Sequence, residues 1–179
     1  MAGLKFRVLL DSKDKHEIFR DILIDENDHF ESFYTAILDA YQFTSDQMAS
    51  FYMSNSSWDK GYEISLFDMA YGEDPDQILP GVMANCVLRN FVKEDDQKII
   101  LVHDFLRMWI FLIELIEVTA EAPAHPKTVL SVGNAPAEDS KSPEAEDLSF
   151  ETEADDNADN EDEFGFGEFE EGYNDFEEY

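Results

Sequence analysis

The chain has 179 residues and a formal net charge of −30, with 42 acidic residues against 12 lysines and arginines. This length is enough for one domain with its own hydrophobic core and a terminal extension. Only four of the basic residues are arginines and they are scattered, so we expect no direct binding of nucleic acid, whereas a basic protein partner fits the charge.

The cysteine content and the N-terminus indicate a cytoplasmic protein. Cys86 is the single cysteine, which excludes an intramolecular disulfide and is typical of a small core residue. No Cys or His cluster has the spacing of zinc ligands, so we expect no metal and no cofactor. The apolar run at residues 8–10 is too short for the core of a signal peptide.

Two strands are predicted near the N-terminus. In "LKFRVLL" (residues 4–10) apolar and other side chains alternate, the period of a half-buried strand. The segment "HEIFRDILID" (residues 16–25) has the same period, and the turn between them predicts a hairpin. One face of the second strand carries Ile18, Arg20, Ile22 and Ile24.

The period then changes to that of a helix over residues 29–41. Asp28 and Glu31 have the spacing of a capping box at its start. The apolar residues follow i, i+3, i+4, i+7 spacing, which predicts an amphipathic helix with one buried face. They are Phe30, Phe33, Tyr34, Ile37, Leu38 and Tyr41.

Further strands are expected at residues 48–54 and 62–67, whereas residues 78–92 fit either a short helix or an irregular segment because of Pro80 and Gly81. The predicted fold class is α+β. It has an antiparallel sheet of about five to six strands and one main amphipathic helix, residues 29–41.

The most apolar stretch, residues 99–118, has the length of a membrane helix. It also contains five titratable residues, several of which cost about 2.5–3.5 kcal/mol each at mid-bilayer, so we expect no membrane span. A hairpin with a tight turn near Leu106 and Arg107 fits better. In a strand, His103 and Asp104 point to opposite faces and cannot form a catalytic dyad.

Asp104 shares its predicted face with apolar residues, so we expect it to be buried and to need a partner. Arg20, between Ile18 and Ile22, is the best candidate for a structural ion pair. The alternative is a functional pocket formed by Arg20, Tyr34, His103, Asp104 and Trp109.

Taken together, these segments resemble the Ri-plasmid ORF-three-like family over residues 4–137. The resemblance depends on the order of a strand with Ile18–Arg20, a helix followed by a strand, and a hairpin with Asp104, Phe105 and Trp109. The family comprises plasmid and insertion-sequence passenger proteins with no assigned biochemical role. It implies an α+β domain built on an antiparallel sheet.

The chain departs from the family pattern where the family often has histidines, a turn Gly-Asp and a cysteine. The corresponding residues are Tyr34, Gln47, Met48 and Ala49 for the histidines, Leu106 and Arg107 for the turn, and "APAED" (residues 135–139) for the cysteine segment. We therefore expect no metal or catalytic role of those groups in this chain.

Composition changes near Ala120 towards Pro, Ala, Ser and acidic residues. We predict a folded domain at residues 2–133, with its last dozen residues semi-ordered, and a disordered acidic tail at residues 134–179. The tail holds 19 acidic residues and one lysine. Its aromatic residues at three- and four-residue spacing are Phe166, Phe169, Tyr173 and Phe176, which we interpret as partner-binding anchors.

The leading hypothesis is a non-enzymatic interaction protein, possibly linked to mobile elements, whose acidic-aromatic tail binds a basic or groove-bearing protein. A tail that only keeps the protein soluble is the simpler interpretation of its charge. The alternative function is an enzyme or small-ligand-binding module with a pocket near Arg20, His103, Asp104 and Trp109. The sequence predicts no particular oligomeric state.

Overall fold

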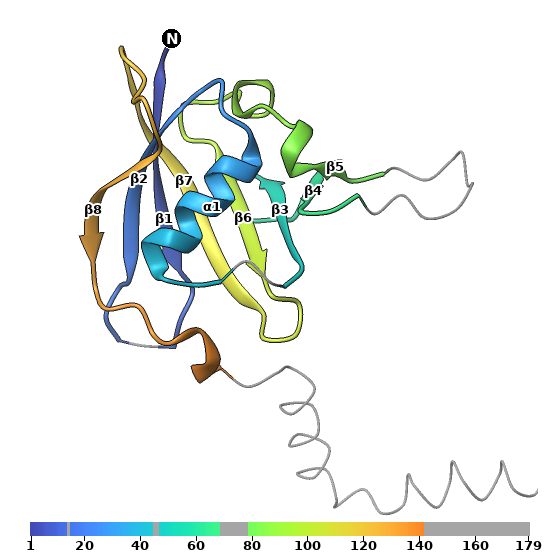
Figure 1. Cartoon of the computed structure of the whole chain (residues 1–179), viewed down its shortest axis with the longest axis vertical. Coiled ribbons are helices and arrows are strands. Elements are labelled where there is room, and N and C mark those ends of the chain that lie inside the picture. Colours follow the sequence, from blue (N-terminus) through green and yellow to red (C-terminus); the bar gives the residue numbers. More distant parts are fainter. Residues whose placement is uncertain (14, 45–46, 69–78, 142–179) are drawn as a thin grey trace, which may run out of the picture. The chain divides into compact units, whose positions relative to one another are not determined.

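The computed structural model describes residues 1–13, 15–44, 47–68 and 79–141 (Figure 1). The chain divides into two compact units, residues 1–141 and residues 142–179. The second unit lies outside the described residues, and so do the four predicted anchors Phe166, Phe169, Tyr173 and Phe176.

In its described residues, the first unit is an α+β domain with one α-helix and a sheet of eight strands in the order β5-β4-β3-β6-β7-β1-β2-β8. The helix is α1 (Phe30–Tyr41), and three short 3₁₀ helices are η1 (Met83–Asn85), η2 (Leu88–Asn90) and η3 (Glu138–Ser140). The strands are β1 (Gly3–Leu10), β2 (Phe19–Asp25), β3 (Ala49–Ser54), β4 (Glu63–Ser65), β5 (Gly81–Val82), β6 (Lys98–His103), β7 (Trp109–Thr119) and β8 (Lys127–Val132).

The predicted N-terminal hairpin is confirmed, because β1 and β2 pair antiparallel with Val8 opposite Arg20. The alternation seen in the sequence becomes the two faces of the sheet. Leu4, Phe6, Val8 and Leu10 are buried in the core, whereas Lys5, Arg7 and Leu9 on the other face are half-buried.

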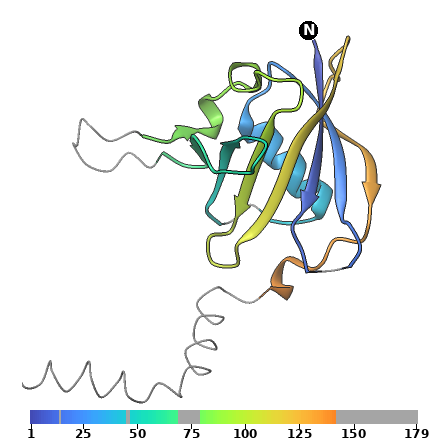
Figure 2. The ribbon, with the colours of Figure 1, turned by 180° about the vertical axis from the view of Figure 1, so that it is seen from behind.

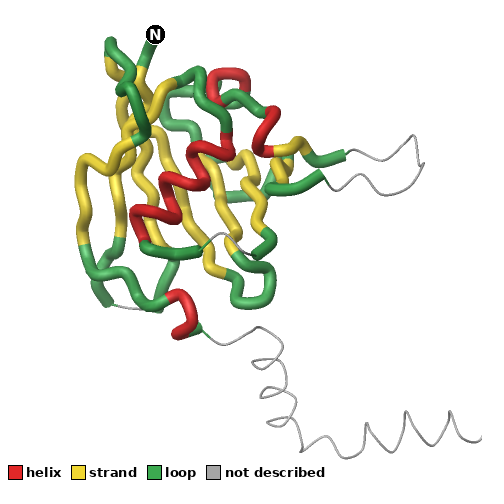
Figure 3. The backbone as a smooth tube through the Cα atoms, in the orientation of Figure 1, coloured by secondary structure: helices red, strands yellow, loops and turns green. Residues whose placement is uncertain are grey.

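The helix predicted at residues 29–41 is also confirmed, and its predicted apolar residues are all buried. It begins after His29 without a side-chain cap, so the capping box of Asp28 and Glu31 does not form. The helix lies across one face of the sheet (Figure 3), where the rings of Phe33 and Phe6 are 4.7 Å apart. Seen from behind, the strands lie in front of the helix (Figure 2).

The sheet is larger than predicted, and it is mixed instead of antiparallel. The extra strands are β5, which pairs parallel with β4, and β8, which pairs antiparallel with β2. In the segment predicted at residues 78–92, the described residues 79–92 contain β5, η1 and η2, so the short-helix interpretation is partly right. Cys86 is buried in the core, as expected.

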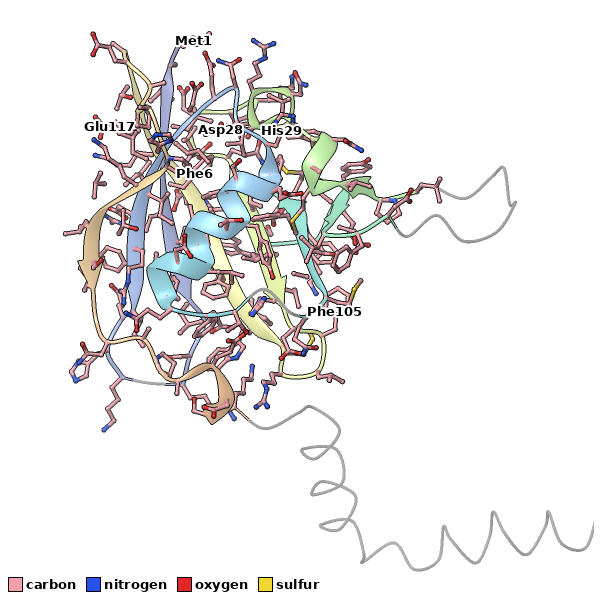
Figure 4. All side chains as sticks on the ribbon, viewed as in Figure 1. Met1, Phe6, Asp28, His29, Phe105 and Glu117 are labelled. Atoms are coloured by element: carbon pink, nitrogen blue, oxygen red, sulfur yellow. The ribbon has the colours of Figure 1, made fainter. Side chains whose placement is uncertain are left out.

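The apolar stretch at residues 99–118 forms β6 and β7, which pair antiparallel as the hairpin interpretation predicted. No helix in the described part of the chain is long and apolar enough to cross a membrane. The strand ends at His103, because Asp104 has a φ of 67°. Phe105 lies in the turn that follows, at the other end of the sheet from Asp28 and His29 (Figure 4).

The predicted boundary between residues 133 and 134 falls inside the first unit. Residues 134–141, called the C-terminal strap below, follow β8 and contain η3. None of the residues of η3 is buried, so the strap is attached to the domain mainly by polar contacts.

Candidate functional site

A chain of hydrogen bonds at the end of β6 connects the helix, the sheet and the strap. The Oη of Tyr34 lies 2.9 Å from Nδ1 of His103, and Nε2 of His103 lies 2.7 Å from Oε2 of Glu138. A carboxylate only accepts hydrogen bonds, so Nε2 of His103 donates to Glu138. In the neutral ring Nδ1 then accepts from the Tyr34 hydroxyl.

Both oxygens of the Glu138 carboxylate are occupied. Oε1 accepts from the main-chain N–H of Thr44 at 2.8 Å and from its hydroxyl at 3.0 Å. The main-chain carbonyl of Glu138 accepts from the indole Nε1 of Trp109 at 3.0 Å. Glu138 therefore binds α1's C-terminal connection, β6 and β7 at once.

The environment of Glu138 changes the pKa of its carboxyl in two opposing ways. Burial favours the neutral form and would raise the pKa. The hydrogen bonds from His103 and Thr44 favour the charged form and outweigh burial, so the pKa lies below its ordinary value of 4.5. Glu138 is thus a stabilised carboxylate and not a poised general acid.

Asp104 serves the turn between β6 and β7. Its Oδ1 accepts from the main-chain N–H of Leu106 at 3.0 Å and of Arg107 at 3.3 Å. Its Oδ2 lies 3.5 Å from Nε of Arg107. Asp and Asn tolerate the left-handed conformation because their side chains bond to the nearby main chain, which explains this residue at a φ of 67°.

Arg107 extends from this turn to the strap. Its Nη1 donates to the carbonyl of Asp139 at 3.3 Å and to that of Lys141 at 2.7 Å. In return, Nζ of Lys141 donates to the carbonyl of Met108 and lies 5.5 Å from the ring centroid of Trp109. The strap is therefore held at Glu138 and again at its last described residue.

A cavity of about 300 Å³ lies beside these contacts. It is lined by Thr44, Gln47, Asp104, Arg107, Glu138 and Asp139. Of the five residues predicted to form a pocket, only Asp104 lines it. His103, Tyr34 and Trp109 are buried behind it, with 0%, 1% and 4% of their surfaces exposed.

The predicted ion pair between Arg20 and Asp104 does not form. Arg20 is buried, but its Nη1 donates to the carbonyls of Phe19 and Val132, both at 2.9 Å, and its guanidinium lies 4.9 Å from the ring centroid of Tyr41. Asp104 pairs with Arg107 instead. Arg20 therefore attaches β8 to the sheet and takes no part in the site around His103.

The series Tyr34, His103 and Glu138 has the residue types of a proton relay, but a substrate cannot reach its central imidazole ring. Catalysis by general acid or base requires a group within hydrogen-bonding reach of a substrate. Here the ring nitrogens of His103 are both bonded within the protein, and the ring has no exposed surface. In the described part of the chain, no three His, Cys, Asp or Glu side chains group as metal ligands.

Sequence reasoning missed the residues that complete the site, namely Thr44, Arg107, Glu138 and Lys141. Glu138 lies in a Pro- and Ala-rich acidic segment that has no periodic pattern, and nothing local connects it to His103, 35 residues earlier. The only available signal was "APAED" (residues 135–139), the segment that resembles the family's Glu-Asp motif.

The fold and the site define a small α+β domain in which a C-terminal strap is bound across the end of a single sheet. The family model for plasmid pRiA4b ORF-3-like proteins matches residues 2–177, and the chain belongs to this family. The resemblance found in the sequence is thus confirmed.

The crystal structure of MM3350, a protein of unknown function from Methanosarcina mazei Go1, is similar to this chain. The two share 19% sequence identity with a TM-score of 0.63, over 79% of this chain and 75% of that one. This likeness concerns the fold alone. No curated protein matches the chain.

Proposed function

We propose that this protein is a non-enzymatic interaction protein of the cytoplasm whose acidic-aromatic C-terminal residues bind a basic or groove-bearing protein partner. The main support is the anchoring of the strap. Glu138 and the carbonyls bound by Arg107 fix the start of the acidic segment to the end of a rigid sheet. The family's plasmid name supports a link to mobile elements.

The use of the polar groups around His103 supports an interaction role over an enzymatic one. The hydrogen bonds in this group are made within the protein: His103 bonds to Tyr34 and Glu138, and Glu138 also bonds to Thr44. A stabilised carboxylate with a lowered pKa suits an anchor, whereas a general acid needs a raised one.

The composition of residues 142–179 favours a partner that is basic or has an apolar groove. This segment has 17 acidic residues and no lysine or arginine, so it attracts a basic surface. Its aromatic residues Phe166, Phe169, Tyr173 and Phe176 have the spacing of one helical stripe. Such a stripe can become ordered in an apolar groove when the partner binds.

The experiment compares the full chain with a chain that ends at Lys141. Both are immobilised and exposed to a lysate at physiological salt, and captured proteins are quantified. The proposal expects a partner that the full chain captures and the shortened chain loses, while both melt cooperatively. Equal capture by the two chains would contradict it.

A second candidate function, small-ligand binding, is supported by the cavity beside Asp104 and Arg107. Its lining combines the guanidinium of Arg107 with the carboxyl groups of Asp104, Glu138 and Asp139, so a small molecule that carries both charges fits it. A panel of small zwitterions in a thermal-shift assay tests this function. A ligand that raises the melting temperature of the parent but not of Arg107→Ala would support it, and a panel without effect would remove it.

A further inference from the structure

The face of the sheet opposite α1 carries a row of apolar side chains across six strands. Figure 2 shows this side of the domain, with the strands in front of the helix. The pairing registers place the row at one level of the sheet. From β8 to β3 its members are Val132, Phe19, Leu9, Leu112, Ile100 and Tyr52.

This apolar row is partly accessible. Ile100 is buried by its neighbours, whereas Leu9, Leu112, Phe19 and Tyr52 are half-buried. Val132 at the edge strand is 37% exposed. In the described part of the chain the only α-helix lies on the other face, so no helix covers the row. Two of its rings have a cation beside them: the guanidinium of Arg7 lies 4.4 Å from the ring centroid of Phe19, and Nζ of Lys60 lies 4.9 Å from that of Tyr52.

The next level of the sheet carries charges of alternating sign, in the order Asp21 on β2, Arg7 on β1, Glu114 on β7 and Lys98 on β6. Arg7 bonds to Asp21 at 2.8 Å, and Lys98 bonds to Glu114 at 3.1 Å.

The level beyond the charged row follows the same rule. It pairs the basic Lys5 on β1 with the acidic Glu117 on β7. These two rows thus contain three bases and three acids, in a chain whose net charge is −30.

The order of these residues is the order that a two-fold axis requires. Consider an axis that runs along the strands, between β1 and β7, in the plane where two such faces meet. It places each residue of β1 opposite a residue of β7 of the other copy, and each residue of β2 opposite one of β6. Leu9 then faces Leu112, and Phe19 faces Ile100.

The same axis places unlike charges opposite each other at the six charged positions of these two rows. Arg7 faces Glu114 and Asp21 faces Lys98 in the next row, and Lys5 faces Glu117 in the row beyond. We propose that this face is the site of self-association, and that its occupant is a second copy of the chain packed sheet on sheet about this axis.

The available area fits such an interface. Six strands at about 4.8 Å spacing, with the eight residues of β1 rising about 3.4 Å each, span roughly 800 Å² per copy. That is the size of a standard interface. The balanced charge matters as well, because elsewhere the excess of acidic residues opposes the approach of a second copy. The inference does not depend on residues 142–179, and it stands apart from the proposed function.

The first test is sedimentation equilibrium of the full chain across a wide concentration range. We expect a monomer–dimer equilibrium that Leu112→Glu weakens by about tenfold or more, since it puts a charge beside the axis. Leu106→Glu, which alters an apolar side chain exposed in the β6–β7 turn, is the matched control and leaves the equilibrium unchanged.

The second test separates contacts between copies from contacts within one copy. Lys5→Glu places two acids opposite each other across the axis, and Glu117→Lys places two bases there. Each variant alone is expected to dimerise less than the parent. Mixed in equal amounts, they restore unlike charges at both positions and form a heterodimer.

Rescue by mixing requires that the two residues meet across copies, because a repulsion within one chain is unaffected by a second chain. A parent that remains monomeric at the highest concentration overturns the proposal. The proposal is also overturned if Leu112→Glu melts like the parent and still dimerises as well as the parent. It is overturned as well if the mixture of Lys5→Glu and Glu117→Lys sediments as its separate components.

Discussion

Replacement of Glu138 by alanine removes the side chain that joins the strap to β6. Three donors lose their acceptor, but they are not equivalent. The two donors of Thr44 belong to an exposed residue and can bind water instead. The Nε2–H of His103 belongs to a ring with no exposed surface, so its loss dominates.

A hydrogen bond to a charged group contributes about 1.5–3 kcal/mol, and we expect the free energy of unfolding to fall by that amount. For a domain of this size about 1 kcal/mol corresponds to roughly 3 °C, so the melting temperature should fall by about 5–9 °C. Thermal unfolding followed by circular dichroism measures this. Asp139→Ala is the control, because Asp139 contributes its main-chain carbonyl to Arg107 and that group is retained.

The effect should also depend on pH, with a sign fixed by the lowered pKa of Glu138. The carboxyl titrates near its ordinary value of 4.5 in the unfolded chain and at a lower value in the folded one. The contribution of Glu138 to the free energy of unfolding is therefore complete above about pH 4.5. It is lost as the pH falls through the pKa of this carboxyl in the folded chain. The difference in stability between the parent and Glu138→Ala should narrow on acidification. A Glu138→Ala variant whose melting temperature at pH 7 equals that of the Asp139→Ala control would refute the anchoring role.

Three further predictions concern Arg20, its independence from Asp104, and the strap. Arg20→Met should lower the free energy of unfolding by about 1–3 kcal/mol, because the carbonyls of Phe19, Ala40 and Val132 lose the donors of this buried side chain. In denaturant unfolding, the double variant Asp104→Asn/Arg20→Met should lose as much free energy of unfolding as the two single variants together. A coupling energy above about 1 kcal/mol between the two changes would instead support the ion pair that the sequence suggested. A chain ending at Lys141 should keep the parent's thermal transition, whereas one ending at Gly133 should melt several degrees lower; equal melting of the two would show that the strap adds no stability.

The regular elements could be predicted because their signals are local. The alternation in β1 and the helical spacing in α1 each reflect burial of one face, which the residue order records directly. β8 gives no such signal, since all six of its residues are exposed and it is held by pairing with β2. Its sequence neighbours, rich in Pro and Ala, indicated a semi-ordered extension instead.

Sequence patterns could predict some residues of the candidate site but not the contacts that complete it. His103, Tyr34 and Trp109 do lie together, because strand pairing and the helix bring them to one end of the sheet. The pair of Arg20 and Asp104 was wrong because β6 ends at His103 and the left-handed conformation of Asp104 turns the chain away from the predicted face. The contact of Glu138 with His103 is non-local, and no sequence period encodes it.

The measurement that tests the proposed interaction role most directly is partner capture by a chain in which Phe166, Phe169, Tyr173 and Phe176 are all replaced by serine. The net charge is unchanged, but the stripe that would be buried at about 1.5–3 kcal/mol per aromatic residue is removed. A matched control replaces the tail aromatics Phe150 and Phe164, which lie outside the stripe, by serine.

At physiological salt we expect the four-serine chain to lose the partner that the parent and the control retain, while all three remain soluble. Full retention by the four-serine chain, followed by loss only as added salt shortens the Debye length below about 8 Å, would contradict binding through the aromatic stripe and leave attraction by charge alone.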